Sequence, residues 1–166
     1  MDKAIHCTPN KKKNSLALAL ISLVAVLATA CTSAAPAAVV NPAEAYAAIS
    51  AGVEMPEMME IPSAIVLDYF GIQSADYSDA VFYICADSLL ADEVVIVNAV
   101  DDDAAKRIKE KLDVRLNQKM VSAQGYSPEQ YEIIRKCEVR VDGKTIAMLV
   151  SPDVENMTKI YEEQLK

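Results

Sequence analysis

The pattern of apolar and polar positions predicts strands in the second half of the chain. Two runs rich in β-branched and aromatic residues, 80–86 and 93–100, are separated by a short polar turn and predict a β-hairpin. The second run contains Val-Val-Ile-Val, which is apolar on both faces of a strand. We therefore expect the strand at 93–100 to lie centrally in its sheet.

A second hairpin is predicted at 137–149, where apolar and polar residues alternate on both sides of Asp142-Gly143. An Asp-Gly pair is typical of a two-residue type I′ turn. Such a turn places Val139 opposite Ile146 and directs both side chains to one core face, whereas Thr145 points outward. Turn chemistry and alternation agree, which supports this hairpin.

Helices are predicted by a recurring start signal, a capping residue followed by proline or by acids. An apolar stripe at helical spacing runs through 101–124, and Gly125 provides the stop. Lys119 falls within this stripe, so we expect its ammonium group to extend past the apolar surface to water. Further helices are expected at 42–50, 63–70, 127–136 and 152–166.

Strands paired by hairpins, with helices between them, predict an α+β fold. We expect an antiparallel sheet of about four strands, built from the two β-hairpins, with helices packed mainly on one face. Prolines at Pro56 and Pro62 interrupt the segment 52–63, which is predicted to be a loop.

The first 30 residues have the pattern of an export signal. Lysines at 11–13 precede an apolar run at 16–27, and small residues follow at 28–30. A membrane helix needs roughly 20 apolar residues, so a permanent span is the second choice. We expect 1–30 to be a signal peptide and 42–166 to form a single exported domain.

Cys31 decides how the mature chain begins. Small residues directly before a cysteine resemble a lipobox, whose cysteine is diacylated, for example with palmitate, and becomes the N-terminus. Ala28 stands where a lipobox usually has Leu, so cleavage at Ala28-Thr29-Ala30 by ordinary signal peptidase, followed by secretion, is the alternative. With lipid on Cys31, residues 31–41 form a flexible tether to the extracytoplasmic face of the cell membrane.

The charges are distributed unevenly along the chain. Residues 31–105 contain 13 Asp and Glu but no Lys or Arg, whereas residues 106–166 contain 12 Lys and Arg against 10 Asp and Glu. The exported part therefore carries a net charge of −11. Nucleic acids and anionic lipid headgroups both require clustered cations, so we expect neither as a partner. The simplest role of the acids is solubility and pairing with the basic long helix.

Histidine is absent from the exported part, because His6 is the only one in the chain. This excludes Ser-His-Asp and Cys-His catalysis and histidine-ligated zinc or copper. Since no other catalytic constellation is recognisable, we expect no enzyme and no cofactor. The leading hypothesis is a non-catalytic envelope lipoprotein that binds an envelope protein or a small ligand. The alternatives are an exported histidine-independent enzyme and a cation-binding envelope protein.

The fold offers a way to choose between the binding module and the enzyme. A deep pocket that collects two or more buried ionisable groups would favour an enzyme. A flat or apolar exposed patch would favour a binding module.

Three groups of residues are candidates for chemistry. Asp101, Asp102 and Asp103 could bind a divalent cation, but acids at a helix start are more simply a cap with favourable dipole charge. Cys85 and Cys137 could form a disulfide outside the cytoplasm or remain separate buried thiols. Tyr126 and Tyr131 flank a helix cap and could either pack against the domain or form a recognition edge.

Four segments of the exported part together resemble a known bacterial family, namely domain of unknown function 4358. The resemblance extends over about 44–165, and the family's members are small exported proteins, commonly lipoproteins of Gram-positive bacteria. It therefore implies a lipid on Cys31, and it implies no activity or site residue. The segments are YFGI (69–72), ADEVVIVNAVDDDAAKRIKEKLDVRLNQK (91–119), YSPEQYEII (126–134) and VRVDGKTIAMLVSPD (139–153).

Overall fold

A computed structural model describes residues 39–165 of the chain. The expected signal peptide, Cys31 and nearly all of the expected tether lie outside these residues. The described residues form one five-stranded antiparallel sheet, in the order β1-β2-β3-β5-β4. The strands are β1 (Met58–Glu60), β2 (Tyr77–Cys85), β3 (Glu93–Ala99), β4 (Val139–Asp142) and β5 (Thr145–Val150).

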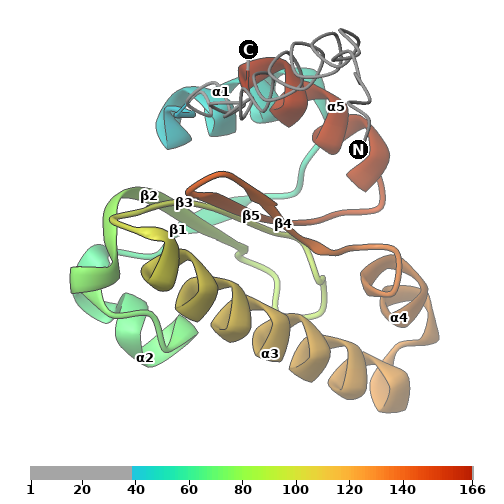
Figure 1. The fold of residues 1–166 in the computed structure, drawn as a ribbon. Coiled ribbons are helices and arrows are strands. Elements are labelled where there is room, and N and C mark those ends of the chain that lie inside the picture. Colours follow the sequence, from blue (N-terminus) through green and yellow to red (C-terminus); the bar gives the residue numbers. More distant parts are fainter. Residues whose placement is uncertain (1–38, 166) are drawn as a thin grey trace, which may run out of the picture. The chain divides into compact units, whose positions relative to one another are not determined.

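Five α-helices of the described residues cover the two faces of this sheet (Figure 1). One face carries α1 and α5, and the opposite face carries α2, α3 and α4. Their bounds are α1 (Pro42–Gly52), α2 (Val66–Phe70), α3 (Asp102–Tyr126), α4 (Pro128–Ile134) and α5 (Val154–Gln164). The expected α+β class is confirmed, with five strands rather than about four and with helices on both faces rather than mainly on one.

The central strand explains why both faces need a cover. Every residue of β3 is buried, and its side chains alternate between two cores. Val95 and Val97 belong to the core under α3, whereas Val94 and Ile96 belong to the core under α1 and α5. Burial of apolar area on both sides drives this arrangement, because an uncovered face of such a strand would expose several aliphatic side chains to water.

The first strand lies in the segment that was expected to be a loop. Met58 pairs with Cys85 and Glu60 with Tyr83, so β1 is a short edge strand. The Tyr83 hydroxyl donates to Glu60 at 3.3 Å, and the Tyr83 ring stacks on Tyr46 of α1 at 3.6 Å between centroids. These contacts are made with distant parts of the chain, so three residues between two prolines carried no local signal of a strand.

The second hairpin forms, but its register differs from the expected one by two residues. Val139 pairs with Met148 and Val141 with Ile146, so the turn is centred on Gly143-Lys144. Gly143 has a φ of 64°, a left-handed conformation that Asp at this position would adopt less readily. A two-residue shift preserves the alternation, so the expected core-facing set is retained.

The outward face of β5 is buried as well, because α1 and α5 lie over it, whereas Glu138 and Arg140 on the other arm of the hairpin are exposed and partly exposed. Thr145 is 2% exposed and donates from Oγ1 to Asn98 Oδ1 at 2.8 Å. Asn98 Nδ2 in turn donates to the Val40 carbonyl at 2.8 Å. This buried polar chain fixes the residues before α1 to the middle of the sheet.

Candidate functional site

Antiparallel pairing gathers polar residues at one end of the sheet. Glu93 begins β3 and pairs with Val150, the last residue of β5. Asp92 and Ser151 lie next to these two residues in sequence and are 4% and 1% exposed. Buried polar groups require partners, so the side chains at this end of the sheet need hydrogen bonds or ion pairs.

Glu93 is completely buried and accepts hydrogen bonds from two cations of α3. Arg115 donates to both carboxylate oxygens, with Nη2 at 2.9 Å, and the Lys119 ammonium donates at 2.8 Å. The Arg115 guanidinium also lies 4.2 Å above the Phe70 ring and donates to the Tyr69 carbonyl at 2.9 Å. Arg115 and Lys119 are four residues apart, so they share a helix face and reach the same carboxylate.

Sequence reasoning found one side of this cluster and missed the other. Lys119 was expected to leave the apolar stripe for water, and instead it ends on Glu93 while remaining 23% exposed. Two features of the sequence could have predicted that Glu93 is paired. Its carboxylate begins a strand that is otherwise apolar on both faces, and the long helix that follows has two cations in or beside its apolar stripe. The expected pairing of the acidic half with the basic helix is confirmed here and at Arg107–Asp76.

Burial favours the neutral forms of two other ionisable groups nearby, Asp92 and Cys137. Burial raises the pKa of Asp92, although the Lys119 charge and the Ser151 side chain counteract part of that effect. Burial also raises the pKa of the Cys137 thiol, which donates to the Ile133 carbonyl at 3.4 Å. A thiol with a raised pKa is a weak nucleophile at neutral pH. Cys85 and Cys137 are both free cysteines.

A cleft of about 660 Å³ opens beside this cluster. It lies between the β2–β3 loop, the C-terminal half of α3, and α4, and Gln130 of α4 accepts a hydrogen bond from the Ala91 amide at 2.8 Å. That bond attaches the loop to the helix and gives the cleft a defined wall. The apolar and cationic lining residues are Leu89, Leu90, Ala91, Arg115, Lys119, Ala123, Tyr126 and Ile134.

Large apolar side chains at the rim of this cleft are exposed to solvent. Tyr126 is 94% exposed, Leu89 is 79% exposed and Leu90 is 38% exposed. The alternative in which Tyr126 packs against the domain is therefore wrong. Tyr131, the other residue of that expected pair, is partly buried and does not line the cleft. Neighbouring exposed apolar side chains that border a concave surface are typical of binding sites.

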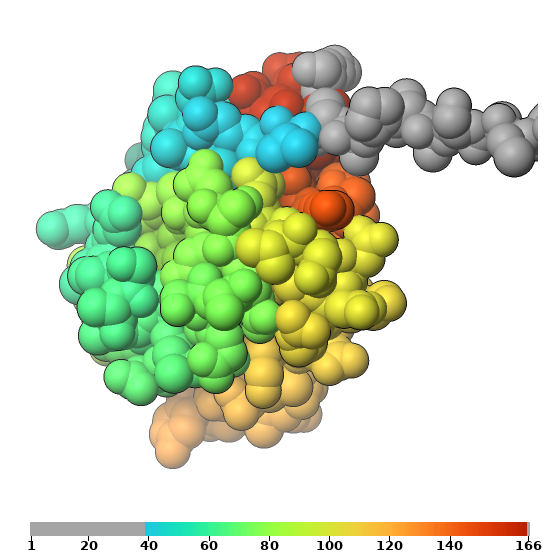
Figure 2. Space-filling model, turned by 60° about the vertical axis from the view of Figure 1, so that its left-hand side comes forward, coloured from blue at the N-terminus to red at the C-terminus, as the bar shows by residue number. Residues whose placement is uncertain are grey.

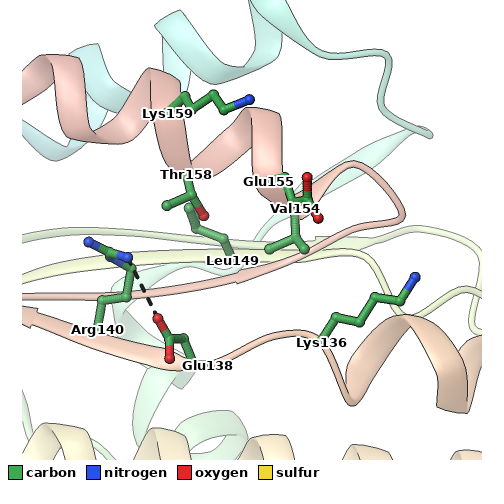
Figure 3. Close-up of a pocket in the computed structure, with 8 residues that line it drawn as sticks. All are labelled: Lys136, Glu138, Arg140, Leu149, Val154, Glu155, Thr158 and Lys159. Carbon is green, nitrogen blue, oxygen red and sulfur yellow. Dashed lines mark ion pairs between the residues drawn. The ribbon is translucent and has the colours of Figure 1, made fainter.

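A second, smaller groove of about 320 Å³ lies between α5 and the edge strand β4 (Figure 3). Lys136, Arg140 and Lys159 approach it together with Glu138 and Glu155. The groove is thus lined by charges of both signs. Arg140 contacts Glu138 at 3.6 Å, and its Nε has no hydrogen-bond partner among the described residues.

The three acids before α3 act as a helix start. Asp101 accepts from the Ala104 amide at 2.7 Å, and Asp103 pairs with Lys106 at 2.8 Å. Residues 39–165 contain no group of three or more acidic, cysteine or histidine side chains placed to hold a metal ion. The cap accounts for the position of Asp101, as the simpler alternative predicted.

Comparison with known proteins places the domain in a family. The model of a family described as a domain of unknown function (DUF4358) matches residues 51–151. The chain belongs to the DUF4358 family. No curated protein and no solved structure matches the chain. The matched residues contain the whole sheet and the cleft, so both are features of the part of the chain that defines its membership in DUF4358.

Within residues 39–165, no helix combines the length and the apolar character that crossing a bilayer requires.

Proposed function

We propose that this DUF4358 protein is an exported binding module, held on the outer face of the cell membrane by lipid at Cys31, that takes a ligand in the cleft between the β2–β3 loop, α3 and α4. The observation that carries the proposal is the cleft itself, where exposed apolar side chains border a floor of fixed polar groups. Its volume lies within the roughly 300–1,000 Å³ of small-molecule sites.

The state of the ionisable groups supports binding over catalysis. Both oxygens of Glu93 are occupied by Arg115 and Lys119, so this carboxylate is not available as a general base. Cys137 has a raised thiol pKa, and the exported part contains no imidazole to activate it. The two buried carboxylates nearby, Glu93 and Asp92, do not line the cleft, and Glu93 is neutralised by Arg115 and Lys119.

The anchor is tested by membrane fractionation of cells that express the full chain. We expect the wild-type protein in the membrane fraction and accessible to protease added from outside, with diacylglycerol on Cys31 by mass spectrometry. Cys31→Ser should move the protein out of that fraction. Cys7→Ser is the matched control, because Cys7 lies in the signal peptide and its loss should change nothing. An intact leader on a cytoplasmic protein would contradict the proposal.

The cleft is tested by amide NMR with a mixed library of small organic fragments. Binding fragments should shift the signals of 88–91 and 118–130 more than those of the rest of the domain. Shifts concentrated at Lys136 and Lys159 would instead identify the smaller groove as the binding site. If the signals of neither the cleft nor the smaller groove shift, a small-ligand function would be contradicted.

A further inference from the structure

The charge of the cleft is opposite to that of the domain. Among the residues that line it are Arg115 and Lys119 but no Asp or Glu, although the exported part contains 23 acidic residues and a net charge of −11. The blue and green part of the face in Figure 2 belongs to about residues 39–95, which contain no Lys or Arg. A cationic floor in so acidic a domain favours an anionic ligand.

The two cations have donors left for a ligand. A guanidinium carries five N–H groups and an ammonium three. Hydrogen bonds to Glu93 and to the Tyr69 carbonyl use three donors of Arg115, and one bond to Glu93 uses one donor of Lys119. Within residues 39–165, two donors on each side chain thus have no partner, and the side chains are 20% and 23% exposed.

Glu93 prepares these cations for binding. It fixes Arg115 and Lys119 before a ligand arrives, so little side-chain entropy is lost on binding. Asp92 is the other buried carboxylate nearby. It interacts with the Lys119 charge and with Ser151, and it does not line the cleft. The cations therefore lie between the buried carboxylates and the solvent, where an incoming anion meets them first.

The rest of the cleft is suited to an apolar body. Leu90, Ala123 and Ile134 line it, and Leu89 and Tyr126 extend from its rim. An aromatic or aliphatic group between these side chains would cover apolar surface that is exposed in the free domain. The smaller groove offers no such combination, because its cations are faced by Glu138 and Glu155.

We propose that the cleft binds an organic anion with an apolar body, its carboxylate or sulfonate on Arg115 and Lys119 and its apolar part against Leu90 and Tyr126. This inference rests on the proposed function, in which the cleft is the ligand site. It adds the chemical class of the ligand.

The probes are a matched pair of fluorescent dyes. 1-Anilinonaphthalene-8-sulfonate has an aromatic body and a sulfonate, and N-phenyl-1-naphthylamine has the same body without the charge. Both are titrated into the mature chain carrying Cys31→Ser, which removes the lipid and leaves every described residue unchanged. We expect saturable one-to-one binding of the sulfonate dye, about tenfold tighter than that of the neutral dye, as one charge-assisted contact would produce.

Three variants locate the binding. Lys119→Gln should weaken binding of the sulfonate dye about tenfold and leave the affinity for the neutral dye nearly unchanged. Tyr126→Ser should weaken binding of both dyes, and because Tyr126 is 94% exposed the substitution should affect folding little. Lys159 is a cation of the smaller groove, so Lys159→Gln should change the affinity for neither dye.

The outcomes separate this inference from the proposed function. Equal affinity for the two dyes, with both weakened by Tyr126→Ser, would overturn the anionic class and keep the cleft as the ligand site. The inference would be overturned if the sulfonate dye showed no saturable binding, or if neither Lys119→Gln nor Tyr126→Ser changed its affinity. The fragment experiment would then decide whether the cleft binds any small molecule.

Lys119→Gln could also lower the melting temperature. In that case the comparison of the two dyes and the Tyr126→Ser variant still test the anionic class of the ligand.

Discussion

Removal of the Glu93 charge should lower the stability of the domain strongly, although the change in side-chain size is small. In Glu93→Gln the side chain keeps its shape but loses its charge, which leaves Arg115 and Lys119 close together without their common carboxylate. Loss of one member of a buried ion cluster is strongly destabilising, and partial exposure of the cations reduces the effect. We expect a loss of about 2–3 kcal/mol in the free energy of unfolding, measured by urea denaturation.

The matched control for Glu93→Gln is Glu132→Gln. Glu132 pairs with Arg135 on the surface of α4, where both side chains are about half exposed. Exposed pairs contribute little, so the urea midpoint should be nearly unchanged. A similar loss in both variants would show that the effect arises from a change in net charge and not from the buried cluster.

Asp92 should make the stability depend on pH in the direction opposite to that of most acids. Burial raises its pKa in the folded domain, so the folded state binds the proton more tightly than the unfolded state. The free energy of unfolding therefore falls as the pH rises from about 3.9, the ordinary pKa of Asp, through the raised pKa. Below about 3.9 the group is protonated in both states and contributes nothing.

Asp92→Asn removes this titration. The stability of the variant relative to wild type should increase as the pH rises from about 3.9 through the raised pKa of Asp92, as followed by urea denaturation at each pH. Asn retains an oxygen that can accept from Ser151, so the comparison isolates the charge. A relative stability that decreases over this range would show that the Lys119 charge outweighs burial.

At the scale of elements, the helices on the α1 and α5 face should contribute as much as those on the other face. Met157 of α5 is completely buried against Ala147 and Leu149 of the sheet core. Met157→Ala removes buried apolar volume and should lower the free energy of unfolding by about 2–5 kcal/mol in urea denaturation. Glu163→Ala, on the exposed side of the same helix, should leave it nearly unchanged.

The elements that could be predicted from sequence are those with local signals. Asn41 accepts from two amides at the start of α1, Ser127 caps α4, and Gly71 ends α2 with a φ of 68°. The long helix and the paired strands also follow from periodicities of 3.6 and 2 residues. Each of these signals lies within a few residues of the feature that it predicts.

The parts that could not be predicted depend on contacts between distant residues. The strand β1 exists because β2 offers it an edge, and the second helical layer exists because β3 is apolar on both faces. The double apolarity of β3 was visible in the sequence, but which helices cover each face was not. The cleft likewise combines residues 88–91 with residues about 25–45 positions later, so only its single members, such as Tyr126 and Lys119, could be singled out.

At the scale of the whole domain, the two cores should unfold together. They lie on opposite faces of one sheet, and neighbouring residues of β3 alternate between them, so one core cannot lose the strand without exposing the other. Single domains of this size usually unfold in one cooperative step. We expect one urea transition, with coincident curves from far-ultraviolet circular dichroism and tyrosine fluorescence.

Variants on the two faces provide the decisive comparison. Ile108→Ala weakens the core under α3, and Met157→Ala weakens the core under α1 and α5, each by truncating a completely buried side chain. If the sheet couples the cores, both variants should shift the midpoint to lower urea while the slope of the transition stays at its wild-type value, because the area exposed on unfolding is unchanged. A smaller slope or a second transition in Met157→Ala alone would mean that α1 and α5 detach from a sheet that α3 still holds.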